Sequence, residues 1–159
     1  MIAHAPPAPA TAPGTLRPTK RARPDVLRGT TEKIQTAMGD VFVTINRDPG
    51  GDPFEVFAAV GKAGSVLMAD VEAICRLASL GLRFGVPIEE IFQQLRGISS
   101  DRTCGFGTRK VLSVPDAIAQ AIGHYLDARA EALGPPDGQR PLHALDPPAS
   151  RISDSTNGV

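Results

Sequence analysis

The sequence predicts an α+β domain, in which a small antiparallel three-stranded sheet is followed by three helices packed on one of its faces. Two observations lead to this fold class. Residues 31–60 contain three short runs with strand-like patterning, separated by turn-forming residues. Residues 65–133 instead repeat apolar side chains at helical spacing in three stretches. Strands that precede helices in this order favour helices layered on one face of a strand meander.

The three predicted strands cover residues 31–36, 41–46 and 56–60. In the middle run the aliphatic residues point to one face, while Phe42, Thr44 and Asn46 point to the other. Met38–Asp40 is the predicted hairpin turn between the first two strands. Asp48–Pro53 is dense in turn-forming residues and leads into the third strand.

The longest predicted helix runs from Ser65 to Phe84 and organises the core. Gly85 follows it as a residue suited to a left-handed helix end. One face of this helix is apolar with a 3.6-residue period, which predicts that it covers the sheet. The positions of that face are Leu67, Val71, Ile74, Ala78 and Leu82.

Two further helices are predicted. Pro87 opens the second helix, in its first turn, and Gly97 ends it. The third begins at Ser113-Val-Pro-Asp116, where a capping serine is followed three residues later by an acid, and it runs to Leu133. Its apolar stripe comprises Ile118, Ala121, Ile122, Tyr125 and Leu126.

Composition divides the 159 residues into three parts. Residues 1–22 are rich in alanine and proline and are predicted to be a disordered basic arm, residues 23–133 the domain, and residues 134–159 a disordered tail rich in proline and serine. The basic residues at this end of the chain are Arg17, Lys20, Arg21 and Arg23. They could bind nucleic acid or an acidic surface, or they could simply keep the arm solvated.

No apolar run approaches the ~20 residues that span a membrane, and the start of the chain lacks the apolar core of a signal peptide. The sequence contains two cysteines, which are too few for a disulfide framework. These features predict a cytoplasmic protein.

The turn Gly61-Lys62-Ala63-Gly64-Ser65 is a candidate anion or nucleotide site, because it leads from a strand to the positive end of a helix. The chain does not contain the phosphate-loop motif, so the glycines can equally be explained as residues that a tight turn requires. A second candidate is the glycine-rich segment 102–110, in which Arg109 and Lys110 could contact phosphates. A flexible surface loop explains that segment as well.

Metal binding and catalysis are not expected. The histidines and the two cysteines are scattered, without the spacing of a metal site. No nucleophile motif is present, and the only histidine in the predicted domain is His124. We therefore predict no catalytic residue, no metal ligand and no cofactor in this chain.

Several motifs taken together resemble the TSCPD domain, which occurs at the C-terminus of adenosylcobalamin-dependent (class II) ribonucleotide reductases and as short free-standing proteins. The resemblance extends from about Arg23 to Leu126. The motifs that carry it are Arg23–Lys33, Val43–Asn46, Pro53–Phe57, Gly61–Gly64, Glu72–Ile74, Leu95–Ile98 and Ser113–Ile118.

This chain departs from the family pattern at the cysteines. The Thr-Ser-Cys-Pro-Asp motif that names the family reads Leu112-Ser-Val-Pro-Asp116 here, so Val114 replaces the cysteine. The other family cysteine positions hold Ala37-Met38 and Ser99-Ser100. The resemblance therefore implies the fold and an association with ribonucleotide reduction, but it transfers no metal or redox role to any residue.

The resemblance implies a free-standing accessory or regulatory domain that works with a reductase chain and has no catalytic site of its own, since the catalytic barrel and the adenosylcobalamin site of the reductases are missing. An alternative is a small module that binds nucleotide or nucleic acid through the basic arm and the Gly61–Ser65 turn. A structural domain that forms homo-oligomers is a third possibility.

Overall fold

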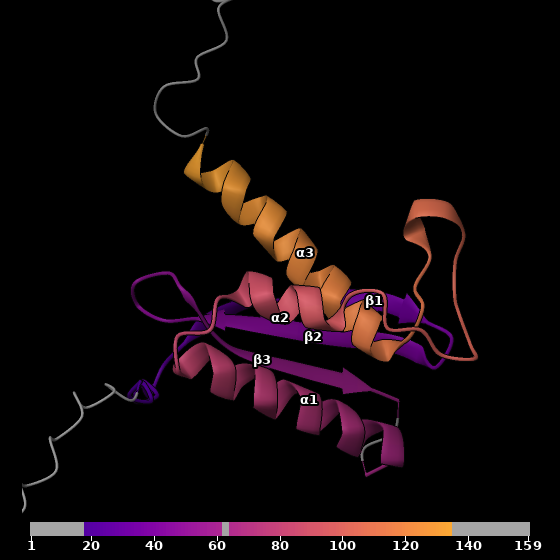
Figure 1. Ribbon diagram of the computed structural model, residues 1–159, viewed down its shortest axis with the longest axis horizontal. Coiled ribbons are helices and arrows are strands. Elements are labelled where there is room, and N and C mark those ends of the chain that lie inside the picture. The colour runs from indigo at the N-terminus through magenta and orange to yellow at the C-terminus, as the bar shows by residue number, and fades with distance from the viewer. Residues whose placement is uncertain (1–17, 62–63, 135–159) are drawn as a thin grey trace, which may run out of the picture.

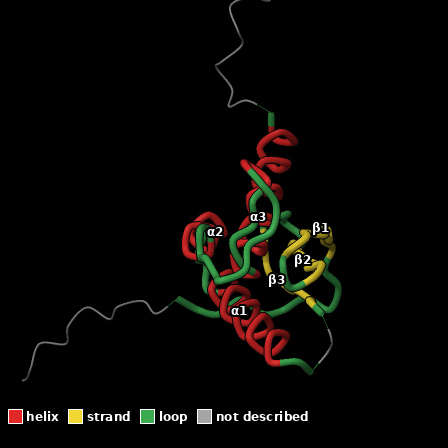
Figure 2. Tube along the Cα trace, turned by 90° about the vertical axis from the view of Figure 1, so that its right-hand side faces the viewer, coloured by secondary structure: helices red, strands yellow, loops and turns green. Residues whose placement is uncertain are grey.

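A computed structural model of the chain describes residues 18–61 and 64–134. Three strands, β1 (Arg28–Thr36), β2 (Gly39–Arg47) and β3 (Pro53–Val60), form an antiparallel sheet in the order β1-β2-β3. Three α-helices follow, α1 (Val66–Arg83), α2 (Ile88–Leu95) and α3 (Val114–Leu133), with a short 3₁₀ turn, η1 (Gly107–Arg109), before the last (Figure 1). Figure 2 shows the helices gathered on one side of the sheet, which confirms the predicted α+β architecture.

The sheet register follows the predicted alternation. Val43 lies opposite Glu32 of β1 and Ala58 of β3, and the aliphatic residues of β2 are all buried, whereas Phe42 on the other face remains 47% exposed. The hairpin turn is Ala37-Met38, so it begins one residue earlier than predicted, and Gly39 starts β2 with a φ of 108°, a conformation that favours glycine. Strand β1 begins three residues earlier than predicted, since it starts at Arg28.

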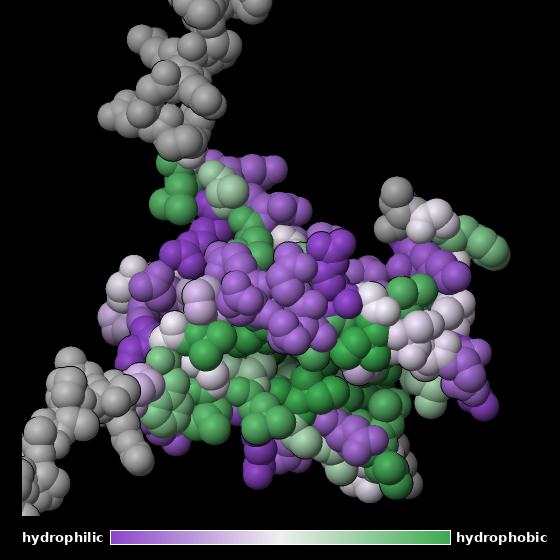
Figure 3. All heavy atoms as spheres, in the orientation of Figure 1, coloured by the Kyte–Doolittle hydropathy of each residue, from purple (hydrophilic) through white to green (hydrophobic). Residues whose placement is uncertain are grey.

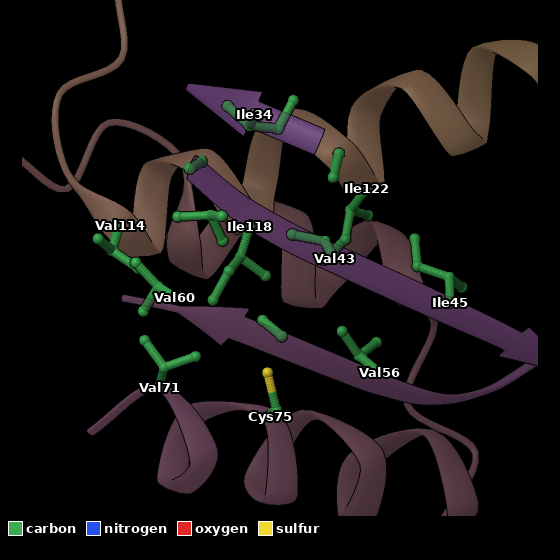
Figure 4. Close-up of a cluster of buried hydrophobic side chains, with 14 of the residues drawn as sticks. Ile34, Val43, Ile45, Val56, Val60, Val71, Cys75, Val114, Ile118 and Ile122 are labelled. Carbon is green, nitrogen blue, oxygen red and sulfur yellow. The ribbon is translucent and has the colours of Figure 1, made fainter. Parts of the chain in front are cut away.

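The core lies between the sheet, α1 and α3. Figure 4 shows Val43, Ile45, Val56 and Val60 of the sheet facing Ile118 and Ile122 of α3 and Val71 and Cys75 of α1. Ile118 and Ile122 are fully buried. The buried face of α1 is Val71, Cys75, Ala78 and Leu82, so Cys75 takes the central place predicted for Ile74, which is only partly buried.

Helix α1 covers the outer edge of β3. The hydroxyl of Ser79 accepts a hydrogen bond from the Val56 backbone N–H at 2.9 Å and donates one to the Val56 carbonyl at 3.1 Å. The Cys75 thiol lies against the Ala58 backbone, and burial raises its pKa to about 11. Side chains of α1 thus satisfy backbone groups that an edge strand would otherwise expose.

The helix starts follow the predicted chemistry, with one shift. Ser65 caps α1 by accepting from the Met68 N–H, and Ser113 caps α3 by accepting from the Asp116 N–H, both at 3.2 Å. Pro87 precedes α2 as its capping residue, with an extended ψ of 142°, instead of lying within the first turn.

Two arginines from the predicted arm and its boundary hold the start of the described chain against the domain. The Arg21 guanidinium binds the Asp48 carboxylate at 2.7 Å and lies over the ring of Phe54. The Arg21 backbone N–H donates a hydrogen bond to the Arg83 carbonyl. Arg23 makes two hydrogen bonds of 2.9 Å to the carboxylate of Glu55. The ordered contacts therefore begin before residue 23, within the segment predicted as arm.

Glu55 is a buried carboxylate with a complete set of partners. It is 4% exposed and also accepts from the side chain of Asn46 at 2.9 Å. Burial by itself raises the pKa of Glu55, but the hydrogen bonds from Arg23 and Asn46 and the positive charges of Arg23 and Arg83 outweigh it. The pKa of Glu55 therefore lies below its ordinary value.

Candidate functional site

The backbone of the predicted anion turn has positive φ angles at two positions, and such angles favour glycine. Gly61 and Gly64 have φ angles of 59° and 77°. The Ser65 hydroxyl accepts a hydrogen bond from the Met68 backbone N–H. This capping bond occupies the hydroxyl that would otherwise be available to an anion. Lys62 lies outside the described residues. Anion binding at this turn stays a prediction.

The segment predicted as a basic loop is a hairpin-like projection. Cys104 and Val111 exchange two backbone hydrogen bonds of 2.9 and 2.7 Å, and the tip carries Phe106, which is 94% exposed. Arg109 and Lys110 follow at the tip and are exposed. Figures 1 and 2 both separate this tip from the turn that precedes α1, and no hydrogen bond or ion pair between described residues joins the two. The predicted site residues thus fall into two sets.

The Ser-Val-Pro-Asp segment closes the base of this projection. Asp116 is 6% exposed and accepts from the backbone N–H of Gly97 at 2.8 Å, from that of Leu112 at 3.1 Å and from the side chain of Gln120 at 2.9 Å. The Ser113 hydroxyl donates to the Ile98 carbonyl at 2.6 Å. Both residues therefore tie the two ends of the 98–112 segment to the start of α3.

A cleft that the sequence analysis missed lies between the second half of α3 and the neighbouring end of the sheet. Its volume is about 600 Å³. The helix lines the cleft with three alanines and with four larger side chains. These residues are Ala121, Ala128 and Ala132, and His124, Tyr125, Arg129 and Leu133. Across from them the sheet contributes Val43 and Ile45 from β2, and polar groups where β1 and β2 leave the core. The polar residues of the sheet wall are Thr30, Glu32 and Arg47.

The polar groups of the cleft are only partly paired. The His124 ring nitrogen Nδ1 lies 2.6 Å from a carboxylate oxygen of Glu32, and Arg129 binds Asp52 at 2.7 Å at the cleft margin. The Tyr125 hydroxyl is buried and makes no hydrogen bond of good geometry with a described residue, although the Arg129 side chain lies beside it. Burial raises the pKa of Tyr125, while the nearby positive charges of Arg129 and Arg47 oppose this rise. A buried hydroxyl without a well-formed hydrogen bond is uncommon in folded proteins.

A signal for the cleft was present in the sequence. Alanines at 121, 128 and 132 lie on one face of the third helix, where a packed core would place larger residues. The predicted apolar stripe is confirmed at Ile118, Ala121 and Ile122, which are buried.

Helix α1 also presents an apolar face to solvent. Leu77 is 69% exposed, and Leu80, Phe84 and the following Val86 are 39–41% exposed. Leu77, Leu80 and Phe84 are three and four residues apart, which is the spacing of a helix-packing seam. Figure 3 shows apolar residues gathered over α1, while the surface over α2 is hydrophilic. We call these four residues the α1 seam.

The described ranges, 18–61 and 64–134, hold no group of three histidine, cysteine or acidic residues placed to bind a metal ion. Within the same ranges no helix combines the length and apolarity needed to cross a bilayer.

The fold and these surfaces define a small α+β domain with a cleft beside α3 and an exposed apolar seam on α1. The chain belongs to the TSCPD domain family, whose pattern matches residues 14–126. No solved structure shows a significant match.

Curated relatives are named vitamin B12-dependent ribonucleotide reductases. The Rhodopirellula baltica protein is 27% identical over 110 residues, which cover 67% of this chain and 11% of that protein. The Streptantibioticus cattleyicolor protein is 30% identical over 114 residues, which cover 71% of this chain and 18% of the relative. The Streptomyces avermitilis protein is 32% identical over 114 residues, covering 71% of this chain and 11% of the relative. The chain thus spans less than a fifth of the length of these relatives.

Proposed function

We propose that this chain is an accessory or regulatory partner of a vitamin B12-dependent ribonucleotide reductase and contributes to deoxyribonucleotide synthesis without catalytic residues of its own. Membership of the TSCPD family supports the link to the reductases. The matched region is only 11–18% of the reductase relatives, and in this proposal a reductase chain supplies the catalytic part and the adenosylcobalamin.

The α1 seam is the observation that carries the proposal of a protein partner. Leu77 and Leu80 lie on the outer side of α1, away from the buried residues Cys75, Ala78 and Leu82. Apolar side chains at this spacing are buried when a second helix packs along them. The reductase chain is the proposed source of that helix.

The test is purification of the tagged full chain from its native host at moderate salt, with identification of copurifying chains. Recovery of a B12-dependent ribonucleotide reductase supports the proposal, and its absence contradicts it. Replacing both Leu77 and Leu80 with lysine should reduce the recovery ~10-fold or more, because burial of each leucine contributes roughly 1.5–3 kcal/mol.

The matched control replaces Gln93 and Gln94 with lysine, since both are exposed on the hydrophilic surface of α2. This variant adds the same charge to the same layer and should retain full recovery. Equal recovery of both double variants would reject the seam as the docking face, while leaving the partnership itself supported.

The alternative function, binding of nucleotide or nucleic acid through the basic arm and the Gly61–Ser65 turn, finds less support. Two of the four basic residues, Arg21 and Arg23, are engaged with Asp48 and Glu55 inside the domain. A test of the arm should therefore replace Arg17 and Lys20 and spare the two structural arginines. Copurifying proteins that disappear after nuclease treatment would favour this alternative over a reductase partner.

A further inference from the structure

The projection formed by residues 98–112 holds an aromatic side chain away from the rest of the domain. Phe106 at its tip is 94% exposed, which is the largest exposed fraction among the large hydrophobic residues of the described chain. Figure 1 shows the tip standing clear of the sheet and of the three α-helices. Single exposed apolar side chains are common and need no explanation, so the shape and charge around Phe106 decide whether it has a role.

The backbone around Phe106 is closely supported. Two backbone hydrogen bonds close the base of the tip, and the Gln120 side chain of α3 donates to the Lys110 carbonyl at 3.0 Å. At the tip itself, Gly105 has a φ of 81°, and a Cβ there would lie 2.5 Å from the Arg109 carbonyl oxygen. The two sides of the tip thus pack so closely that only glycine fits. An aromatic side chain on such a support loses little conformational freedom on binding.

The projection is also the basic part of an acidic domain. Residues 101–110 contain three cations and one acid, whereas the rest of residues 24–133 contains eight cations and thirteen acids. Arg109 and Lys110 are exposed, and neither makes a salt bridge with another described residue. Positive charge therefore surrounds Phe106, while the body behind it is negative.

These features fit a protein surface that has an apolar pocket and a rim of carboxylates. Aromatic anchors supply much of the binding energy of protein interfaces, and complementary charges around them steer the partners together. Nucleic acid fits less well, because the acidic body of the domain would repel a polyphosphate chain. A second copy of this chain also fits less well, since the tip would contact a different face of its neighbour, and such head-to-tail contacts do not close into a dimer.

We propose that Phe106 inserts into an apolar pocket on a protein partner, and that Arg102, Arg109 and Lys110 pair with acidic residues around that pocket. The partner is the reductase chain, so this contact rests on the proposed function. It is made by a different part of the domain from the α1 seam, and it specifies the chemistry of the surface that the partner must present.

The test measures surface plasmon resonance between the immobilised full chain and the reductase chain that the tagged wild-type chain recovers. Phe106→Ala should weaken the affinity roughly 10-fold or more, the loss typical of truncating an anchoring aromatic residue. Phe42→Ala is the matched control and should leave the affinity unchanged, because Phe42 is 47% exposed and lies on the outer face of the sheet. Circular dichroism and urea unfolding will check that both variants fold.

The cations of the projection have a separate kinetic signature. Arg109→Gln combined with Lys110→Gln should slow association roughly 10-fold at low salt and reduce its dependence on salt, with little change in the dissociation rate. The control combines Arg28→Gln with Arg47→Gln, since these two exposed arginines lie opposite each other on β1 and β2. This control removes the same charge and should leave the salt dependence of association unchanged.

The possible failures can be told apart. Equal affinity of the wild-type chain and Phe106→Ala for the reductase would overturn this contact and leave the partnership supported. A wild-type chain that recovers no reductase would reject the proposed function and this contact with it. A wild-type homodimer that Phe106→Ala dissociates, seen by analytical ultracentrifugation, would assign the tip to a second copy of the chain instead. Nucleic acid that the wild-type chain retains and Phe106→Ala loses would likewise overturn the proposal.

Discussion

The start and the middle of α3 each carry a buried polar group, and the two groups differ in their hydrogen bonding. At the start of the helix, Asp116 accepts three hydrogen bonds and is nearly inaccessible to solvent. Two turns further on, the buried Tyr125 hydroxyl has no partner in the described part of the chain, and a cleft opens beside it. A buried group with all of its hydrogen bonds stabilises the fold, whereas a buried hydroxyl without a well-formed hydrogen bond contributes less. Asp116 is therefore a structural residue, whereas the Tyr125 hydroxyl adds little to the stability of the fold.

The largest expected effect is on stability, and it concerns Asp116 at the start of α3. Asp116→Ala removes the acceptor from the backbone N–H groups of Gly97 and Leu112, and it should lower the free energy of unfolding by about 2–3 kcal/mol. Urea unfolding measures this change. Asp127→Ala is the control, because Asp127 is an exposed acid on the same helix. Similar unfolding midpoints for the two variants would mean that Asp116 is not the structural clamp described here.

A smaller effect on stability is expected at Tyr125, in the middle of α3. Tyr125→Phe removes a hydroxyl that has no described partner, so the free energy of unfolding should stay unchanged or rise by up to ~1 kcal/mol. The same urea experiment measures it. A loss of stability comparable to that of Asp116→Ala would contradict the difference described here between Asp116 and Tyr125.

The smallest effect concerns protonation of the same hydroxyl. Burial raises the pKa of Tyr125, so the folded chain should release this proton at a higher pH than the unfolded chain, which titrates near ~10. The associated stability is fully present below the unfolded pKa and is lost as the pH rises through the folded pKa. Tyrosinate absorbance, followed against pH with and without urea, detects the difference. Coincident titration curves would show that the hydroxyl is freely hydrated.

Sequence reasoning predicted the elements well, because each of them depends on local patterns. The alternation around Val43, the spacing from Val71 to Leu82 and the capping serine Ser113 can all be read within one segment. These patterns, together with the turn residues, were sufficient for the order and type of all three strands and all three α-helices.

The missed features depend on contacts between distant segments. Arg21 binds Asp48, which is 27 positions away in the sequence, and Arg23 binds Glu55, which is 32 positions away. The hydrogen bond between His124 and Glu32 joins residues that are 92 positions apart. Nothing in the arm by itself distinguishes a solvated arginine from one that pairs with a buried carboxylate. The cleft was missed for a related reason, since a gap exists only when two surfaces are brought together.

The hydrogen bonds of Ser79 to β3 have a consequence for assembly. With β3 covered by α1, β1 is the one outer strand of the described sheet whose edge no helix covers in this way. Strand addition from another chain could therefore occur only along β1. Two copies joined there would form a continuous sheet of three plus three strands, and each end of it would be a covered β3. Pairing of this kind ends at a dimer, so the arrangement of α1 protects the domain against open-ended fibre growth.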